Sequence, residues 1–296
     1  IYFMIIVKLI GGLGNQLFQY AAGRRLASIH NAELKLDVSG FKTYKLHAYS
    51  LNHFHITALE ASDVEIEALK DPEPRSLVGK ITERFKQYGL ASRNPHYIKE
   101  PKSGLDTTIL NLPDNVYLDG YWQSEKYFKD IEAVIRREYT LRYPLTEKSQ
   151  EVAKKIKKIE SAVAIHVRRA DYINSSNQQI YETLGSCYYK KALEIITEKI
   201  SSPSFFIFSD DIIWARENFK LNFPTTFMDF NGVGRNYEDL HLMSLCKHQI
   251  IANSSFSWWG AWLNENKNKT VIAPEFWLRG VEAIEEERYP TNWITI

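Results

Sequence analysis

Two adjacent arginines at the end of an apolar segment are the residues of this sequence best suited to chemistry. Residues 162–171 read AVAIHVRRAD, so Arg168 and Arg169 follow a run typical of a strand buried on both faces of a parallel sheet. The carboxyl ends of such strands form the edge at which open α/β sheets bind ligands. A guanidinium pair there predicts a site for an anion, most simply a phosphate. The alternative is that both arginines only pair with surface acids such as Asp171.

Two more polar clusters follow predicted strands in the same half of the chain. Residues 209–211 (SDD) come after a strand predicted over 204–208, and residues 253–257 (NSSFS) come after one predicted over 249–252. Because parallel strands end at the same edge of a sheet, we expect both clusters to lie beside the arginines. This convergence indicates a site more strongly than any single cluster does.

Each of these two clusters opens a predicted helix. At Ser254, Ser255 and Ser257 the hydroxyls, the backbone amides and the positive helix end favour an anion, whereas N-capping alone would account for one serine. Acids are also favoured at a helix start, so Asp210 and Asp211 are interpreted either as helix caps or as nucleoside ligands. A metal-binding pair is a further alternative, but two arginines already neutralise a phosphate.

Three tryptophans follow the serines directly. Trp258 and Trp262 stand four residues apart, which is the spacing of a buried helix face. We therefore favour core packing over a sugar-binding platform for them.

A glycine-rich turn near the amino terminus is a second candidate phosphate site. A strand predicted over residues 4–10 leads through Gly12 and Gly14 into a helix, and such a turn lets backbone amides approach a phosphate. The pattern matches a dinucleotide-binding fingerprint only in part, because Leu17 stands at its third glycine. With Asp37 as a ribose-binding acid, a nicotinamide-dependent oxidoreductase is an alternative function.

The order of predicted elements indicates an α/β protein of two domains. The chain has 296 residues, more than a single core usually holds. Strands and helices alternate after residue 162, which predicts a parallel sheet with helices on both faces. We place the domains at 1–155 and 156–296, with an amphipathic helix over 147–160 near the junction and the tail packing back across the domains. A helix that begins after Gln123 and runs on through Arg137 is also expected.

Composition excludes some classes of partner and location. The chain carries 37 Lys and Arg against 36 Asp and Glu, so any basic site must be local, and no affinity for nucleic acid is implied. No apolar run reaches the ~18 residues of a membrane span, and no metal-ligand spacing emerges. Cys187 and Cys246 are far apart and are expected to be reduced, as in a cytoplasmic protein. The lysines of helix 147–160 leave a weak peripheral contact with an acidic membrane surface open.

Five segments together carry a resemblance to a known family. The sequence resembles the α-1,2-fucosyltransferases of glycosyltransferase family 11, of the bacterial type, through GGLGNQLFQYAAGRRLA (11–27), GYWQSEKYF (120–128), HVRRADY (166–172), FSDD (208–211) and NYEDLHLMSLCKHQIIANSSFSWWGAWL (236–263). The resemblance implies a GT-B-type architecture, in which two Rossmann-like domains face each other across a cleft. It also implies a GDP-β-L-fucose donor and inverting transfer to the 2-hydroxyl of a terminal β-galactoside. No metal is expected, and the first-half loops would supply the acceptor pocket.

The same resemblance implies donor-binding roles for individual residues. Arg168 would hold the β-phosphate of the donor with support from Arg169, and His166 would be a donor contact. Asn15 would reach the diphosphate from the opposite domain, beside Gly12 and Gly14. The remaining donor-binding residues would be Asp210 for guanosine, and Ser254, Ser255 and Phe256 for the diphosphate and nucleoside.

Catalysis would rest mainly on Arg168. Breaking a glycosyl phosphate bond leaves negative charge on the diphosphate, so a preorganised cation beside it lowers the barrier. Inversion also needs a group that takes the acceptor proton. The α-1,6-fucosyltransferases carry a glutamate a few residues after the aspartate of this motif, whereas residues 172–176 here read YINSS. Asp171 is therefore the candidate base, although it could simply orient Arg168.

A non-catalytic glycan-binding protein that uses its aromatic residues is the third hypothesis, beside the fucosyltransferase and the oxidoreductase. It leaves the arginine pair unexplained.

Overall fold

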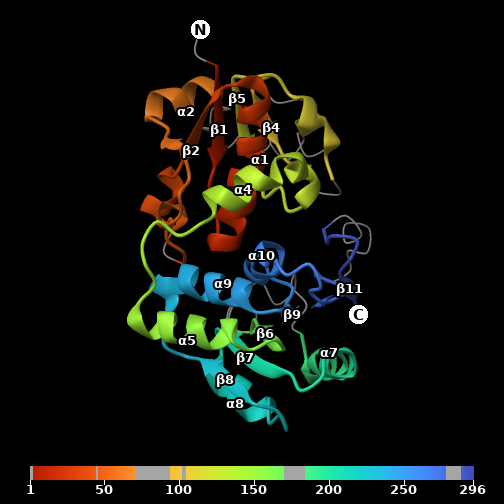
Figure 1. Ribbon diagram of the computed structural model, residues 1–296. Helices are drawn as coiled ribbons and strands as arrows, with labels where there is room; N and C mark the ends of the chain where they lie inside the picture. Colours follow the sequence, from red (N-terminus) through yellow and green to blue (C-terminus); the bar gives the residue numbers. More distant parts are fainter. Residues whose placement is uncertain (1–2, 45, 71–93, 102–104, 170–183, 278–287) are drawn as a thin grey trace, which may run out of the picture. The chain divides into compact units, whose positions relative to one another are not determined.

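The computed structural model describes residues 3–44, 46–70, 94–101, 105–169, 184–277 and 288–296. Contacts divide the chain into two compact units, Ile1–Thr140 and Leu141–Ile296, which are described separately below. The division falls before the helix predicted over 147–160, whereas the sequence placed the junction at residue 155. That helix packs into the core of the second unit (Figure 1).

The N-terminal unit holds a parallel sheet with strand order β3-β2-β1-β5-β4 in its described part. The strands are β1 (Met4–Lys8), β2 (Glu33–Asp37), β3 (Leu59–Glu60), β4 (Tyr97–Lys99) and β5 (Val116–Asp119). The helices are α1 (Leu13–His30), α2 (Asp63–Leu69) and α4 (Glu132–Glu138), with 3-10 turns η1 (Ser39–Lys42), η2 (Leu51–His53), η3 (Thr107–Asn111), η4 (Glu125–Tyr127) and η5 (Lys129–Ile131).

Helices cover both faces of this sheet. Helix α1 lies so close to β1 that a Cβ on Gly23 would come within 2.2 Å of Val7 Cγ2. On the other face, Ile66 and Leu69 of α2 pack against Ile6 and Tyr117. This layering is the Rossmann-like arrangement that the alternation of elements predicts.

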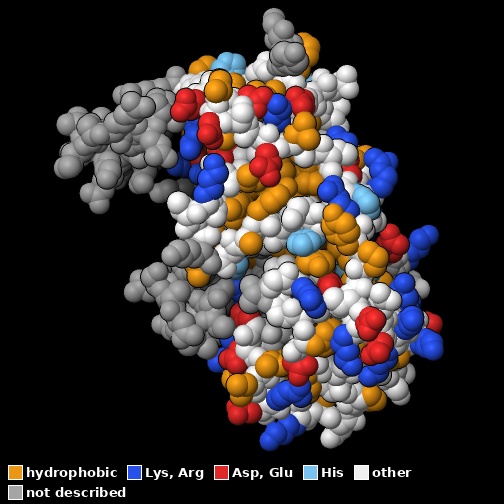
Figure 2. All heavy atoms as spheres, turned by 90° about the vertical axis from the view of Figure 1, so that its left-hand side faces the viewer, with side chains coloured by type: hydrophobic (Ala, Val, Ile, Leu, Met, Phe, Trp, Pro, Cys, Tyr) orange, Lys and Arg blue, Asp and Glu red, His pale blue; other side chains and the backbone are white. Residues whose placement is uncertain are grey.

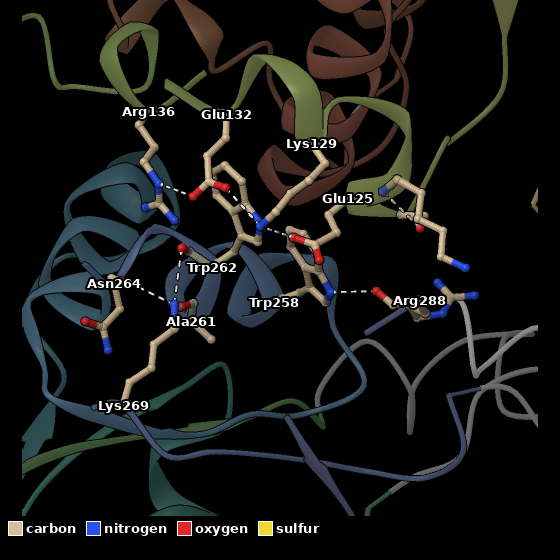
Figure 3. A network of polar contacts seen from close by, with 12 residues as sticks. Glu125, Lys129, Glu132, Arg136, Trp258, Ala261, Trp262, Asn264, Lys269 and Arg288 are labelled. Atoms are coloured by element: carbon tan, nitrogen blue, oxygen red, sulfur yellow. Dashed lines mark hydrogen bonds and ion pairs between the residues drawn. The ribbon is translucent and has the colours of Figure 1, made fainter. Parts of the chain in front are cut away.

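The prediction of a single helix that runs on through Arg137 is wrong. The chain instead forms η4, η5 and α4 in succession, and Phe128 between the first two turns has an extended φ of −146°. Figure 3 shows how ion pairs join all three elements: Lys129 Nζ of η5 lies 3.0 Å from Glu125 of η4 and 2.9 Å from Glu132 of α4. A sequence rich in charged i,i+4 pairs therefore looks more helical than the chain is.

The C-terminal unit holds a second parallel sheet, with described strand order β11-β10-β9-β6-β7-β8. Its strands are β6 (Ala162–Val167), β7 (Ser204–Ser209), β8 (Thr225–Met228), β9 (His248–Ile250), β10 (Val271–Ala273) and β11 (Ile294–Thr295). Its helices are α5 (Glu147–Lys157), α7 (Ser186–Lys199), α8 (Ile212–Asn218), α9 (Asn236–Leu245) and α10 (Ser255–Leu263), with the 3-10 turn η7 (Val233–Arg235).

Alternate residues of β6 face two different core layers. Val163, Ile165 and Val167 pack with α7 and α8, whereas Ala162 and Ala164 pack with α5 and α9. All six residues of the strand are buried, as the apolar run predicts. The described part of the tail adds β11 to the edge of this sheet, beside β10.

Helix α10 is anchored inside the C-terminal unit. Trp258 Nε1 donates to the carbonyl of Arg288 at 3.0 Å, and Lys269 Nζ donates to the carbonyls of Ala261 and Asn264 at 2.8 Å each (Figure 3). A cation at the carboxyl end of a helix satisfies its orphan carbonyls and complements its dipole. Trp258 and Trp262 are both buried, so the interpretation as core is confirmed.

Candidate functional site

The three polar clusters of the second half lie at one edge of the C-terminal sheet. In the parallel register Val167 of β6 stands opposite Ser209 of β7, and Ile165 stands opposite Ile250 of β9. Each cluster follows the carboxyl end of its strand. The structure therefore brings together the segments that the sequence predicted to converge.

Asp210 holds the backbone and one side chain of the arginine pair. Its Oδ2 lies 3.2 Å from Arg168 Nε, and its Oδ1 accepts a hydrogen bond of 2.8 Å from the amide of Arg169. The pair is only partly exposed, and ion pairs of this kind orient side chains more than they stabilise a fold. The arginines thus pair with a neighbouring loop, while Asp171, the expected partner and candidate base, lies outside the described residues.

Arg169 is held flat against helix α8. Its guanidinium carbon lies 4.0 Å from the centroid of the Trp214 ring, and its Nε is 3.9 Å from Asp211 Oδ2. Asp211 also caps α8 by accepting a hydrogen bond of 3.1 Å from the Trp214 amide. Stacking and capping fix the direction of a cation that would otherwise swing freely. Of the two interpretations of Asp211, the structure shows the cap.

His166 is a buried, neutral imidazole beside the arginines. It is 5 % exposed, and its ring centroid lies 5.5 Å from that of Phe256. Burial first, and then the charge of Arg168, lower its pKa to about 3. No partner for its Nδ1 is found among the described residues. At pH 7 the ring therefore carries no charge and can offer a hydrogen bond at the sheet edge.

The serines at the start of α10 are not equivalent. Ser257 is fully buried, and its hydroxyl lies 3.4 Å and 3.3 Å from the carbonyls of Ala252 and Ser254. Ser254 stands at the N-cap without a side-chain capping bond, and Ser255 is the first helical residue. The anion site predicted from three serines can therefore draw on Ser254 and Ser255 but not on Ser257.

Two tyrosines of α7 pin the ends of the strands that carry this edge. Tyr189 donates to the carbonyl of His166 at 3.1 Å, and Tyr188 donates to the carbonyls of Ile251 and Ile272 at 2.6 Å and 3.3 Å. Both ring systems lie against the core. Sequence reasoning missed them because a tyrosine at the start of a helix gives no sign of which distant carbonyl its hydroxyl will reach.

In the donor site that the resemblance implies, the Tyr189→Phe variant should weaken donor binding at a stability cost of about 1 kcal/mol. The change removes one hydrogen bond that fixes the backbone just before Arg168, so we expect the donor KM to rise about fivefold. The acceptor KM should stay unchanged. Tyr139→Phe is the matched control, because Tyr139 also donates to a buried carbonyl, that of Leu17, in the N-terminal unit. An equal rise of the donor KM in both variants would contradict a positioning role.

The glycine turn of the N-terminal unit contains a backbone conformation that favours glycine. Gly11 has φ of +78°, and a Cβ there would come within 2.5 Å of Asn15 Nδ2. Asn15 in turn accepts a hydrogen bond of 2.8 Å from Gln123 Nε2, while Gly12 caps α1 and Gly14 is buried. The predicted contact of Asn15, Gly12 and Gly14 with a diphosphate stays a prediction.

Asp37 does not have the setting of a ribose-binding acid. It is 2 % exposed and accepts hydrogen bonds of 2.6 Å from the Tyr117 hydroxyl and 2.9 Å from the Ser39 amide. Leu17 is fully buried, and Gly23 provides the close helix–strand approach that the third fingerprint glycine normally gives. Helix–strand packing therefore explains the pattern that resembles a dinucleotide-binding fingerprint.

Two adjacent acids in α9, the buried Glu238 and the partly buried Asp239, were also missed. Glu238 accepts hydrogen bonds of 3.2 Å and 2.8 Å from the amide and hydroxyl of Thr146, and Asp239 accepts one of 2.6 Å from Asn231 Nδ2. Burial raises the pKa of Asp239 to about 6, against the opposing effect of the Asn231 bond. In sequence, adjacent acids in a first helical turn are expected to face solvent.

The described residues contain no group of three or more His, Cys, Asp or Glu side chains arranged to hold a metal ion. Cys187 and Cys246 are free thiols, as expected. Within the same residues, no helix combines the length and apolar character needed to cross a bilayer.

Comparison with known proteins identifies the family. The model of glycosyl transferase family 11 matches residues 80–296, which is more than half of the chain. The chain belongs to glycosyltransferase family 11. It is thus a glycosyltransferase, and the oxidoreductase and non-catalytic hypotheses are set aside.

Two of three relatives of this family 11 chain described below are named for α-1,2 transfer. An alpha-1,2-colitosyltransferase of Escherichia coli is 32% identical over 99% of both chains. An O-antigen biosynthesis glycosyltransferase of Escherichia coli is 29% identical over 92% of this chain and 94% of its own. The human galactoside alpha-(1,2)-fucosyltransferase 1 is 28% identical over 60% of this chain and 52% of its own.

Solved structures confirm the GT-B-type fold of the family 11 chain, with two Rossmann-like domains. The NodZ alpha-1,6-fucosyltransferase soaked with GDP-fucose aligns with a TM-score of 0.51 at 16% identity, over 89% of this chain and 93% of its own. Arabidopsis thaliana FUT1 in complex with GDP aligns with a TM-score of 0.51 at 12% identity, over 92% and 70%.

Proposed function

We propose that this protein is an inverting galactoside α-1,2-fucosyltransferase, which transfers L-fucose from GDP-β-L-fucose to the 2-hydroxyl of a terminal β-galactoside. The observation that carries the proposal is the arginine pair at the carboxyl end of β6, oriented by Asp210 and Trp214. The family and the α-1,2 linkage named for two of its relatives support the same chemistry.

In this proposal the sheet edge holds the leaving group. Arg168 binds the β-phosphate, and its charge stabilises the negative charge that grows on GDP as the bond to fucose C1 breaks. Arg169 supports the diphosphate, and the first turn of α10 at Ser255 adds the helix dipole. Asp210 orients the side chain of Arg168 and the backbone of Arg169. His166 contacts the donor as a neutral group. The acceptor oxygen attacks C1 from the opposite side, which inverts the configuration, and its proton passes to a base for which Asp171 is the candidate.

A donor carrying colitose is the second candidate. The relative that is 32% identical over nearly the whole chain is named for colitosyl transfer. Colitose is L-fucose without the 3-hydroxyl, so the two donors share the nucleotide and the whole leaving-group chemistry. The two donors differ only in the 3-hydroxyl of the sugar, so only protein groups that contact this hydroxyl would distinguish them.

The donor is tested by parallel turnover with GDP-fucose and GDP-colitose. Each is incubated with lactose in EDTA, released GDP is measured, and the product linkage is determined by NMR. A fucosyltransferase is expected to give a higher kcat/KM with GDP-fucose, because a site that hydrogen-bonds a hydroxyl rejects the analogue lacking it. A preference for GDP-colitose would reassign the donor. Turnover lost in EDTA and restored by a divalent cation would contradict the metal-free reaction.

A further inference from the structure

Two loops at the carboxyl edge of the N-terminal sheet, those after β1 and β2, are joined by the side chain of Gln16. Its Nε2 donates to the carbonyls of Gly11 at 3.0 Å and Ala48 at 2.9 Å, and its Oε1 accepts from the Ser50 amide at 2.9 Å. Asn15 ties the loop after β5 to the same turn through Gln123. Ala48 and Ser50 of the segment after β2 are thus held beside the glycine turn.

This segment carries a set of aromatic rings in mutual contact, which we name the aromatic shelf: Phe41, Tyr44, His47 and Tyr49. The Phe41 centroid lies 6.5 Å from that of Tyr44 and 6.3 Å from that of Tyr49, and the Tyr44 and His47 centroids are 5.9 Å apart. The His47 ring reaches the glycine turn, since a Cβ on Gly12 would lie 3.5 Å from it.

The shelf is partly open to solvent. Tyr44 is 40 % exposed, and the neighbouring Leu46 is 71 % exposed. Aromatic rings of this size would bury a substantial apolar surface on binding a ligand. Hydrophobic side chains also gather on the N-terminal unit in the face shown in Figure 2. An exposed aromatic group built on a rigid support and placed at the ligand-binding edge of a sheet indicates a binding surface.

The chemistry of the shelf suits a sugar ring better than a phosphate. Its rings are uncharged when His47 is neutral, and aromatic rings offer flat apolar faces with polar edges. A galactoside has the complementary form, because its axial 4-hydroxyl leaves one face of the pyranose lined with C–H groups. The charged part of the proposed donor, by contrast, matches the arginines of the C-terminal unit.

We propose that the aromatic shelf binds the terminal galactoside of the acceptor, with the apolar face of the sugar stacked on Tyr44. The inference rests on the proposed function for the identity of the sugar, and it assigns named residues to the acceptor pocket that the resemblance places in the first-half loops. Stacking on Tyr44 would hold the acceptor beside the glycine turn.

The test is a Tyr44→Ala variant examined by kinetics and by direct binding. Loss of one stacked ring should raise the acceptor KM about three- to tenfold, with the donor KM unchanged. Tyr44→Phe keeps the ring and should behave like the wild type. Tyr143→Ala is the matched control, because Tyr143 is 62 % exposed in the C-terminal unit. An unchanged acceptor KM in Tyr44→Ala, or an equal rise of both KM values, would overturn the proposal.

Saturation-transfer NMR of lactose with each variant separates this inference from the proposed function. A wild type that binds lactose without turning over any donor would refute the proposed function and leave the shelf supported, provided that Tyr44→Ala weakens the transfer signal. Lactose signals of equal strength in the wild type and Tyr44→Ala would refute the shelf, whatever the turnover. A wild type without any lactose signal at millimolar sugar would also refute it.

Discussion

Arg168→Ala is expected to lower the rate of glycosyl transfer about a hundred- to a thousandfold, which is the usual effect of removing one preorganised group that stabilises developing charge. The fold should be kept, because the Arg168–Asp210 ion pair is partly exposed and such pairs add little stability. The measurement is kcat from GDP release under saturating donor and acceptor, together with the melting temperature of the variant.

Two further variants show whether charge or geometry is responsible. Arg168→Lys keeps the charge but loses the planar fork, so an intermediate rate is expected. Arg216→Ala is the matched control in the same unit, because Arg216 pairs with an aspartate, Asp229, as Arg168 pairs with Asp210. It should transfer at the wild-type rate. Full activity of Arg168→Ala would remove the basis of the proposed mechanism.

Sequence reasoning succeeded where a local pattern determines the structure. The mainly apolar run that precedes the two arginines forms a fully buried strand, Ala162–Val167, as its pattern predicts. Convergence of the three polar clusters then followed from the parallel direction of the strands. A glycine-rich turn before α1 was also predicted, but the residue that needs glycine for its φ of +78° is Gly11 and not the expected Gly12 or Gly14.

Sequence reasoning failed where the outcome depends on distant partners. Nothing in the order of residues tells that Asp210 will hold Arg168 while Asp211 caps a helix, because both acids occupy equivalent places in the pattern. Ser257 looked like a ligand, but its hydroxyl finds backbone carbonyls instead. The tyrosine hydroxyls of α7 reach carbonyls that lie 23 and more positions away in the chain. Tertiary packing decides which partner each of these side chains bonds, so the partner cannot be deduced from the local sequence.

The core of α10 links packing to the proposed site, since the helix that begins at Ser255 is held in place by its tryptophans. Trp258 is fully buried, stacks on Trp262 with ring centroids 6.2 Å apart, and lies 5.6 Å from the ring of Trp293. Its indole N–H also bonds the carbonyl of Arg288. These contacts place Trp258 among the residues whose truncation leaves a large cavity.

Trp258→Ala is therefore expected to destabilise the protein by about 3–5 kcal/mol. For domains of this size class, each kcal/mol corresponds to about 2–4 °C, so the melting temperature should fall by roughly 6–20 °C. Phe276→Ala is the control, because Phe276 is exposed in the same unit and its removal should leave the melting temperature nearly unchanged. A Trp258→Ala variant that keeps its melting temperature but loses acceptor binding would contradict the core role and make this tryptophan a sugar-binding platform. The buried face of α10 would then not explain the orientation of Ser254 and Ser255.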